Sequence, residues 1–479
     1  MNQLSKMARL ARFVLICLPW LIGTPETGQA QPSDQRGVIA LSGLGAFREP
    51  GPNWVLSSDA VADLSKDNFL RPVPGTGVVV NNMHPAGNTH LVTQKEFGDM
   101  DLELDFMMSK NANSGVYLQG RYEVQLLDSW TRLDPAFSDC GGIYQRWDES
   151  RGEQREGYEG VAPLMNVARA PGLWQHLKVS FQAPRFDDKG HKIENARFKR
   201  VYLNGVLVQL EAAVTGPTRS SYYGDEKPLG PLVLQGDHGN VAFRNIRYAP
   251  LDTASVEIST DDPILVNPQG KPYLLRSFLN YGEKKLTHVI SAGYPNQSNF
   301  SYDLKEGALF QIWRGKFLDV TDMWHERGEP QLAKPLGSVI VLSDGPSVAV
   351  LPSPAAPWPD SVAFDDFNNK GYVLDENRFP TFEYSYGGIE AKDKISAAQP
   401  GSLTRVISIT SPPPGLYGRI ALAARIESLG NGWYAVGDKS YYLQLDAKYK
   451  PLIRQTHSGQ EILVPLTKSS SQITYSITW

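Results

Sequence analysis

The alternation of apolar and polar residues along the chain predicts strands rather than helices. Residues 101–106 read Asp-Leu-Glu-Leu-Asp-Phe and alternate strictly, which is the pattern of a strand with one wet face. Residues 122–127 alternate too, with Glu123 and Gln125 at their polar positions. Further strands are expected at residues 174–181, 197–208, 231–235 and 241–248, with Asn204-Gly205 as a hairpin turn.

These strands place residues 37–250 in one β-rich domain, for which we expect a two-sheet jelly-roll sandwich. From residue 252 the chain changes character and continues as a second β-rich domain, expected to be a sandwich, to residue 479. Its strands are predicted at residues 286–292, 308–313, 338–341, 403–409 and 441–445. The 43 Gly and 34 Pro suit many strands joined by turns, so the predicted fold class is all-β.

A long polar insert, residues 146–170, interrupts the first domain. It carries Trp147 and Tyr158 among many charged residues. Loops of this length without structure of their own tend to be functional or disordered. The two aromatic residues favour an ordered lid over a site.

The N-terminus has the pattern of a secretory signal peptide over residues 1–30. Three basic residues precede an apolar run at residues 13–22, and small residues follow at Gly28 and Ala30. Ten apolar residues are too few to cross a bilayer as a helix, so we expect an exported protein, periplasmic or secreted, without a stable membrane span. The formal net charge of −4 gives no electrostatic footprint for nucleic acid.

Two stretches of the first domain are dense in polar side chains. Residues 113–129 read as two paired strands, yet they hold Arg121, Glu123, Gln125 and Asp128 close together. Residues 234–246 form the second stretch, which includes Gln235, His238 and Arg244. Polar groups set between strand residues indicate a concave face that holds a polar ligand such as a sugar.

These stretches identify a family resemblance. The first domain closely resembles the 3-keto-disaccharide hydrolase domain family, with motifs in the right order at residues 113–115, 122–129, 141–144, 172–176, 202–209 and 234–246. The resemblance covers about residues 37–250 and implies a concanavalin-like jelly roll that acts on glycosides oxidised at C3. One departure is that Ser129-Trp-Thr-Arg-Leu-Asp-Pro135 stands where a branch of the family has a His-Pro pair. No role that depends on that histidine is carried over.

Residues 279–331 resemble a domain that is attached to haem-containing sugar dehydrogenases of some bacteria. A sugar-oxidising dehydrogenase is therefore a candidate partner. The haem attachment motif itself is absent from the sequence.

The chemistry that the resemblance implies begins with an acidic proton. A ketone at C3 acidifies the proton on C2, so a base can remove it, the glycosidic oxygen then leaves C1, and water adds afterwards. His238 is the first candidate for base or acid, because imidazole titrates near neutral pH. Glu123 is the second, because a carboxylate on an inward strand face is costly unless it is paired or functional. The alternatives are a hairpin-capping His238 and an ion pair of Glu123 with Arg121 or Arg244.

Eight residues are candidate substrate ligands. Arg121 and Arg244 are expected to donate to the ketone oxygen, and the aromatic residues to stack on a sugar ring. The alternatives are that Arg244 ties the last strand to its sheet, that Asp128 caps a turn, and that the aromatic residues are core. The eight are Arg121, Gln125, Asp128, Tyr144, Trp147, Tyr158, Gln235 and Arg244.

No cofactor is expected. His325-Glu-Arg-Gly-Glu329 lacks the second histidine of a zinc helix, and the remaining histidines lack ligand spacing. Structural calcium fits only by analogy with lectin-like sandwiches. The leading interpretation is thus a hydrolase or lyase of 3-keto-glycosides. Its rivals are a noncatalytic glycan-binding module and a structural partner of a sugar dehydrogenase.

Overall fold

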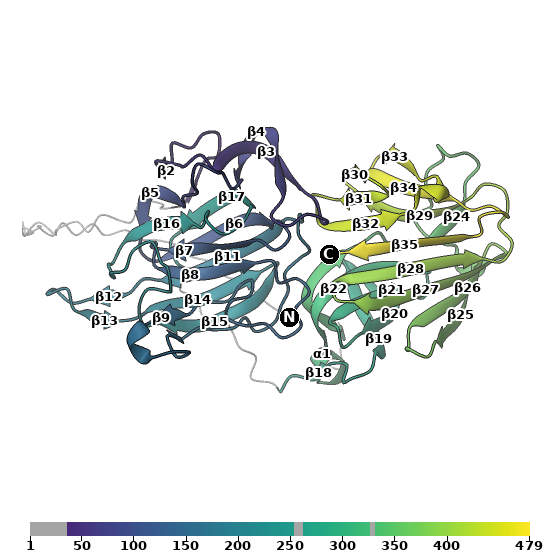
Figure 1. Cartoon of the computed structure of the whole chain (residues 1–479). Coiled ribbons are helices and arrows are strands. Elements are labelled where there is room, and N and C mark those ends of the chain that lie inside the picture. Colours follow the sequence, from purple (N-terminus) through teal and green to yellow (C-terminus); the bar gives the residue numbers. More distant parts are fainter. Residues whose placement is uncertain (1–35, 253–261, 326–330) are drawn as a thin grey trace, which may run out of the picture. The chain divides into compact units, whose positions relative to one another are not determined.

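Two antiparallel sheets make up the first half of the chain (Figure 1). The structure is a computed structural model that describes residues 36–252, 262–325 and 331–479. The predicted signal peptide lies outside the described residues. The larger sheet has the order β15-β14-β11-β6-β17-β4-β3, and β1 pairs with β17. Its strands are β1 (Gly37–Val38), β3 (Trp54–Ala62), β4 (Leu70–Asn81), β6 (Met100–Met108), β11 (Gln175–Gln182), β14 (Ala196–Leu203), β15 (Val206–Val214) and β17 (Val241–Ala249).

The smaller sheet has five strands in the order β2-β5-β16-β7-β8. These are β2 (Phe47–Arg48), β5 (Leu91–Phe97), β7 (Asn113–Leu118), β8 (Tyr122–Leu127) and β16 (Gly230–Leu234). Two short hairpins stand apart from both sheets: β9 (Arg146–Trp147) with β10 (Gly157–Tyr158), and β12 (Arg185–Phe186) with β13 (Lys192–Glu194).

A single apolar core joins these two sheets. Leu102, Leu104 and Phe106 of β6 are fully buried in it together with Val116 of β7 and Val124 of β8. Because side chains alternate across a strand, residues 123 and 125 of β8 then face away from the core. The alternation that predicted β6 and β8 is confirmed, and the second of these strands has the predicted bounds, Tyr122–Leu127.

The hairpin turn between β14 and β15 is where the sequence placed it. Asn204 and Gly205 both have positive φ, 51° and 81°. A two-residue turn of that kind matches the twist of the strands that it joins, and Asn-Gly is its preferred sequence. This turn fixes the register of the outer strands of the larger sheet.

The second half of the chain is also built from antiparallel sheets. One has the order β18-β22-β21-β20-β19 with β23 beside β22, one is β24-β29-β34-β33, and one is β25-β26-β27-β28-β35-β32-β31-β30. Their strands are β18 (Leu265–Val266), β19 (Tyr273–Tyr281), β20 (Lys284–Gly293), β21 (Ser298–Asp303), β22 (Ala308–Asp319), β23 (Lys334–Val341), β24 (Val348–Val350), β25 (Phe367–Leu374), β26 (Pro380–Tyr386), β27 (Ile389–Gln399), β28 (Ser402–Ile409), β29 (Leu416–Ala423), β30 (Ile426–Gly430), β31 (Trp433–Val436), β32 (Tyr441–Leu445), β33 (Leu452–Thr456), β34 (Gly459–Pro465) and β35 (Gln472–Thr478).

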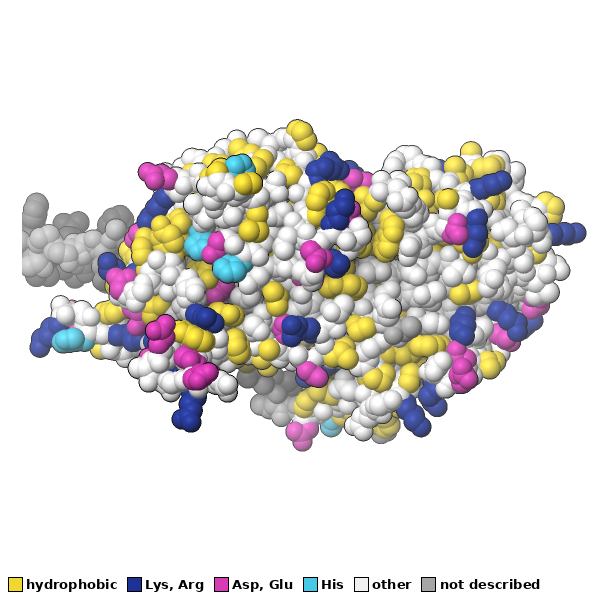
Figure 2. All heavy atoms as spheres, in the orientation of Figure 1, with side chains coloured by type: hydrophobic (Ala, Val, Ile, Leu, Met, Phe, Trp, Pro, Cys, Tyr) yellow, Lys and Arg dark blue, Asp and Glu magenta, His cyan; other side chains and the backbone are white. Residues whose placement is uncertain are grey.

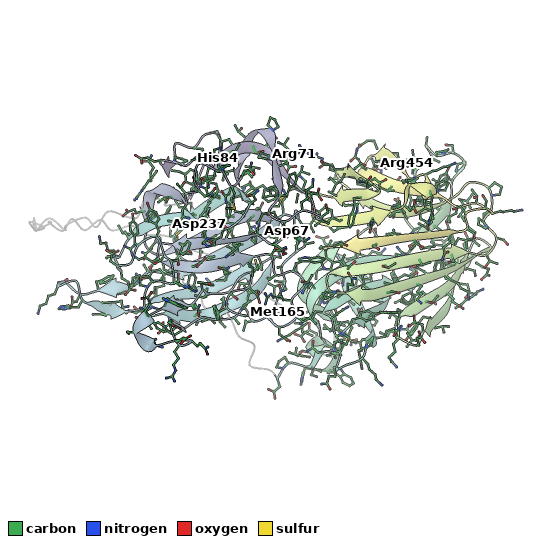
Figure 3. The ribbon with its side chains drawn as sticks, viewed as in Figure 1. Asp67, Arg71, His84, Met165, Asp237 and Arg454 are labelled. Atoms are coloured by element: carbon green, nitrogen blue, oxygen red, sulfur yellow. The ribbon has the colours of Figure 1, made fainter. Side chains whose placement is uncertain are left out.

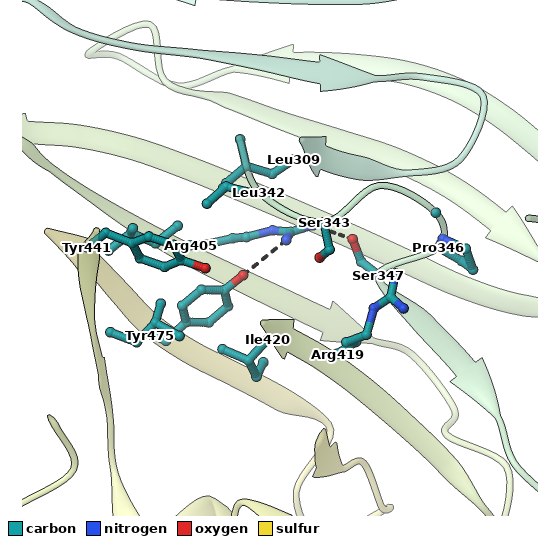
Figure 4. A pocket seen from close by; sticks show the side chains of 13 residues that line it. Leu309, Leu342, Ser343, Pro346, Ser347, Arg405, Arg419, Ile420, Tyr441 and Tyr475 are labelled. Atoms are coloured by element: carbon teal, nitrogen blue, oxygen red, sulfur yellow. Dashed lines mark hydrogen bonds between the residues drawn. The ribbon is translucent and has the colours of Figure 1, made fainter. Parts of the chain in front are cut away.

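A buried ionic cluster lies inside this second half (Figure 4). The guanidinium of Arg405 donates from Nε to Asp393 Oδ1 over 2.9 Å and from Nη1 to the hydroxyl of Tyr475 over 3.0 Å. The Tyr302 hydroxyl donates to the other carboxylate oxygen of Asp393. The cavity beside Arg405 measures about 20 Å³, which is room for about one water molecule. This cluster is therefore part of the core rather than a ligand site.

Helices are short in the part of the chain that the structure describes. They are α1 (Thr321–Trp324) and the 3₁₀ turns η1 (Glu149–Arg151), η2 (Phe364–Asp366) and η3 (Ala447–Tyr449). None of the helices in residues 36–252, 262–325 and 331–479 is long and apolar enough to cross a membrane. The predicted all-β class, with a jelly-roll-like sandwich first and a second β-rich part after it, is confirmed. Residues 36–479 group into one unit, and the boundary near residue 252 stays a prediction.

Candidate functional site

The outer face of the five-stranded sheet carries a row of polar side chains. Cross-strand register sets Gly115 opposite Gln125 and Tyr117 opposite Glu123. The amide Nε2 of Gln125 donates to Asn113 Oδ1 over 2.8 Å. Alternation turns all of these side chains to the face opposite the apolar core. The polar positions of the 113–129 stretch therefore share one surface.

Glu123 is a buried carboxyl group on this face, and its pKa is strongly shifted. Its side chain is 2% exposed, and burial raises the pKa of its carboxyl group to about 8. A hydrogen bond from Tyr117 acts in the opposite direction, while the nearby charge of Asp237 raises the pKa further. Among the described residues, no arginine lies within ion-pair distance of it. Burial therefore favours the protonated form of Glu123, and strongly shifted pKa values of this kind cluster at functional sites.

The loop after β16 brings an imidazole to the same face. His238 Nδ1 lies 2.6 Å from Asp237 Oδ1, and the His238 side chain is 55% exposed. Gln235 Nε2 lies 3.4 Å from the same nitrogen. In the tautomer in which Nδ1 donates to the Asp237 carboxylate, the lone pair is on Nε2. Figure 2 shows histidine and acidic side chains gathered on this face of the first half, and Figure 3 labels Asp237 there.

A second histidine, His90, stands behind this pair. Its Nδ1 accepts a hydrogen bond from the Gly236 backbone N–H over 3.3 Å and lies 3.9 Å from Asp237 Oδ1. Its ring stacks on Tyr117 with centroids 6.3 Å apart. Burial lowers the pKa of His90, so the neutral imidazole is favoured. His90 thus links the Asp237 loop to the strand that carries Tyr117.

Glu123, Gln125, Tyr117 and His238 line one cleft of about 220 Å³. Gln235 is 7% exposed, and its Oε1 atom has no hydrogen-bond partner among the described residues. Buried polar atoms are almost always satisfied, so an orphan acceptor in a cleft is suited to a ligand donor. The cleft is lined by Asn113, Tyr117, Glu123, Gln125, Tyr144, Arg219, Ser220, Gln235 and His238.

Arg219 supplies the cationic wall of the cleft. Its guanidinium lies over the ring of Trp147, 3.7 Å from the centroid. In the described part of the chain it has no acidic partner within ion-pair distance, so its charge is not neutralised by a neighbouring carboxylate. Trp147 belongs to β9 of the predicted insert, which therefore touches the cleft wall through Arg219. The role of the insert as a lid stays a prediction.

Five of the predicted site residues are brought together and five are not. Glu123, His238, Gln125, Tyr144 and Gln235 line the cleft, while Trp147 contacts it only through Arg219. The ion-pair alternative for Glu123 is not what the structure contains: Arg121 pairs with Asp225, and Arg244 pairs with Asp105 and Asp438.

The remaining predicted ligands are engaged elsewhere. Arg244 lies on β17 of the larger sheet with its guanidinium over Trp174, so it ties the last strand down. Asp128 accepts from the Asn111 backbone N–H over 2.8 Å, which is the turn-capping alternative. The ring of Tyr158 is covered by the guanidinium of Arg151, 3.8 Å from its centroid.

Four residues that line the cleft were not among the predicted site residues: Asn113, Tyr117, Arg219 and Ser220. His90, which stacks on Tyr117, was not predicted either. Tyr117 could have been found, because it sits two positions from Gly115 on a strand whose polar face was already suspected. His90 and Arg219 come from segments far from both polar stretches, and only strand pairing brings them near Glu123.

Metal-binding groups are scarce in residues 36–252, 262–325 and 331–479. These residues contain no cluster of three or more His, Cys, Asp or Glu side chains arranged to hold a metal ion. The expectation that the site works without a cofactor stays a prediction.

Comparisons with known proteins come from solved structures and from a family model. Two candidate glycosyl hydrolases of Parabacteroides distasonis ATCC 8503 align with 45% of this chain, over 84% and 100% of their own chains. Their identities are 23% and 19%, and their TM-scores are 0.31 and 0.30. A carbohydrate binding module, CBM66 from Bacillus subtilis, aligns with 41% of the chain and 95% of its own, at 10% identity and a TM-score of 0.21. At such TM-scores nothing about this chain is inferred from them.

Curated proteins offer no significant match to the chain. The family model does, over the part of the chain that holds the cleft. The family resemblance of this part is confirmed: residues 53–249 match the family described as the 3-keto-alpha-glucoside-1,2-lyase-like domain.

Proposed function

We propose that the protein is an exported enzyme that cleaves 3-keto-glycosides by removing the C2 proton, eliminating the glycosidic oxygen and then adding water. The observation that carries this proposal is the pairing of a buried carboxyl group, Glu123, and an exposed imidazole, His238, in one cleft. The family domain over residues 53–249 supports a glycoside-processing role. The order of proton transfers below is our own assignment.

His238 acts as the base. Its Nδ1 hydrogen bond to Asp237, 2.6 Å long, orients the ring and stabilises the imidazolium that forms when Nε2 takes the C2 proton. The exposed position of the ring at the cleft mouth allows this proton to be reached. Asp237 is then a positioning residue, since it acts through His238.

Glu123 acts as the acid. With its pKa raised to about 8, it holds a proton at neutral pH and can deliver it to the glycosidic oxygen as the C1–O bond breaks. The electron pair of the broken C2–H bond forms the C1=C2 double bond, and the pair of the C1–O bond stays on the leaving oxygen. A water molecule then gives a proton to the Glu123 carboxylate, and the hydroxide oxygen of that water adds to C1. His238 returns its proton to C2, so the net reaction is hydrolysis.

Negative charge develops on the ketone oxygen when the C2 proton leaves. Arg219 is the cation of the cleft, and its unpaired guanidinium is the donor that would stabilise this enolate. Gln125 and Asn113 form a hydrogen-bonded amide pair, which suits the hydroxyl groups of a neutral sugar. This assignment replaces Arg121 and Arg244, whose guanidinium groups are held by carboxylates elsewhere.

The test is incubation of the full chain with a 3-keto-disaccharide and with its unoxidised parent, following release of free sugar. We expect release from the 3-keto sugar alone, and in D₂O we expect deuterium at C2 of the product. Cleavage of neither sugar, with binding retained, would leave a noncatalytic glycan-binding module as the function. Equal cleavage of both would contradict the C2 proton mechanism, because the parent lacks the acidifying ketone.

The two proton-transfer roles are tested by Glu123→Gln and His238→Ala. Each is expected to lower kcat by about 10²–10⁴-fold, the usual contribution of a positioned acid or base. Gln keeps the size of Glu123, and His238 is exposed, so both variants should fold. Unchanged rates in both variants would remove these assignments.

Export and the dehydrogenase partner stand as parts of the same proposal. The basic and apolar pattern of residues 1–30 supports export, and residues 279–331 support a partner that oxidises sugars. Secretion of a fusion that carries residues 1–30 would test the first. Co-purification with a sugar dehydrogenase from the same cell would test the second.

A further inference from the structure

A flat row of neutral polar side chains crosses the last sheet of the second half. In strands β28 and β35, buried residues alternate with residues that face outward, as the pattern of β28 shows. The outward residues include Thr404 on β28 and Ser476 on β35. The other outward residues of the two strands, among them Ser402 and Val406 on β28, are uncharged as well.

Strand register aligns the row across four neighbouring strands. Thr404 is opposite Ser476, Ser476 is opposite Gln444 of β32, and Gln444 is opposite Trp433 of β31. Neighbouring strands lie about 4.8 Å apart, so the four positions span roughly 14 Å. Ser396 of β27 is opposite Thr404 and extends the row by one strand. Two hydroxyl groups, an amide and an indole therefore follow one another in a line.

The end of the row formed by Gln444 and Trp433 has hydrogen-bonding groups that are not used by other described residues. Gln444 is exposed, and neither its amide nor the Trp433 indole N–H has a hydrogen-bond partner in the described part of the chain. The Trp433 ring meets Tyr442 edge-on, with an interplanar angle of 89° and centroids 6.1 Å apart. That contact holds the indole in place without covering both of its faces. Ser476 and Thr404, by contrast, lie 3.3 Å apart and share a hydrogen bond.

The row forms one wall of a groove of about 640 Å³. Trp130 and Asn111 line the groove as well, so an aromatic ring stands at two places along it. Its two charged lining residues each have a partner: Lys110 pairs with Asp67 at 3.1 Å, and Asp128 Oδ2 accepts from the Asn111 backbone N–H. Asp128 Oδ1 is buried and has no hydrogen-bond partner among the described residues. The groove therefore offers neutral donors and acceptors beside aromatic faces.

We propose that this groove binds a neutral oligosaccharide, away from the cleft of Glu123. Sugar hydroxyl groups match neutral amide and hydroxyl partners, and the apolar face of a pyranose ring packs on an indole. An ordinary wet sheet face is the alternative, but such a face has no need of an uncharged row that ends in a partly buried tryptophan. The site would hold the glycan whose oxidised ends the cleft processes, yet it does not depend on that chemistry.

The experiment measures binding of the full chain to maltohexaose, cellohexaose and hexagalacturonate by calorimetry. We expect one of the two neutral hexasaccharides to bind and the acidic one not to bind. Trp433→Ala is expected to weaken binding at least about tenfold, which corresponds to 1.4 kcal/mol. The matched control is Trp324→Ala, which removes an exposed indole on α1, 61% exposed and outside both sites. This control should leave binding unchanged.

Gln444→Ala and Thr404→Val test the site independently, in case Trp433→Ala does not fold. Each removes one hydrogen-bonding group of the row, and valine keeps the β-branched shape of threonine, so we expect a weakening of about threefold to tenfold. Binding of neither neutral hexasaccharide, equal binding of hexagalacturonate, or unchanged binding in all three row variants would overturn the proposal. Cleavage of a small 3-keto-disaccharide is expected to be unaffected by Gln444→Ala, so failure here and failure of the proposed enzyme activity are told apart.

Discussion

Gly115 leaves the space that the carboxyl group of Glu123 occupies. The two residues lie on neighbouring strands, and a Cβ atom at position 115 would stand 2.9 Å from Glu123 Cδ and overlap its Oε1 atom. The backbone at Gly115 does not have a positive φ, so conformational strain is not the reason for glycine here. Glycine is needed because the buried carboxyl group of Glu123 approaches the backbone closely.

The first prediction is that Gly115→Ala displaces the Glu123 carboxyl group and lowers kcat by about 10²-fold, the effect of moving a catalytic group by about 1 Å. The fold should survive, because the clash is with the end of a flexible side chain. Steady-state kinetics and circular dichroism measure the two effects. Gly45→Ala is the control, since a Cβ atom there meets nothing within 4 Å. Full activity in Gly115→Ala would show that the position of the carboxyl group is unimportant.

The second prediction concerns stability and pH. Unfolding exposes Glu123 to water, where its pKa returns from about 8 toward 4.5. Below pH 4.5 both states hold the proton, whereas between pH 4.5 and 8 only the folded state does, so rising pH favours unfolding. Above pH 8 both states are charged and the difference is constant. The wild-type protein should therefore lose stability relative to Glu123→Gln by about 1.4 kcal/mol per pH unit within that window.

Urea unfolding of both proteins at several pH values measures this difference, and subtraction removes the other titrating groups. Glu103→Gln, on the outer face of β6, controls for loss of one carboxyl group. A difference that does not change between pH 5 and pH 8 would mean that Glu123 is not a buried acid.

Strand periodicity carried most of what could be predicted about the fold. Residues 122–127 were placed correctly because Val124 and Leu126 face the core while Glu123 and Gln125 face away. The Asn204-Gly205 turn was found because few other pairs accept two positive φ angles. The ion pair of Arg121 with Asp225 could not be predicted, because Asp225 lies 104 residues further along the chain. The positions of Arg219 in the cleft and of His90 beside it could not be predicted either, because both residues come from segments without a polar periodicity of their own.

The third prediction tests the buried pair in the second half. Arg405→Met leaves Asp393 buried and unpaired, so we expect a loss of about 3–5 kcal/mol in the free energy of unfolding. Arg425→Met is the matched control, because Arg425 pairs with Glu427 in solvent, where such a pair is worth about 0–1 kcal/mol. Urea unfolding followed by tryptophan fluorescence compares the two. Equal losses would mean that burial adds nothing to the Arg405–Asp393 pair.

The last prediction is that two neighbours of Glu123 move the alkaline limb of the rate profile in opposite directions. If Glu123 must be protonated, kcat/KM should fall above about pH 8 in the wild-type protein. The Tyr117 hydrogen bond lowers the pKa of Glu123, so Tyr117→Phe should move the limb to higher pH. The charge of Asp237 raises that pKa, so Asp237→Asn should move the limb to lower pH, along with a large drop in rate because His238 loses its partner. Tyr248→Phe is the control and should leave the limb in place, because the Tyr248 hydroxyl accepts its hydrogen bond from the exposed Lys95 and does not line the cleft. Shifts of the same sign in both variants would mean that the limb belongs to a group other than Glu123.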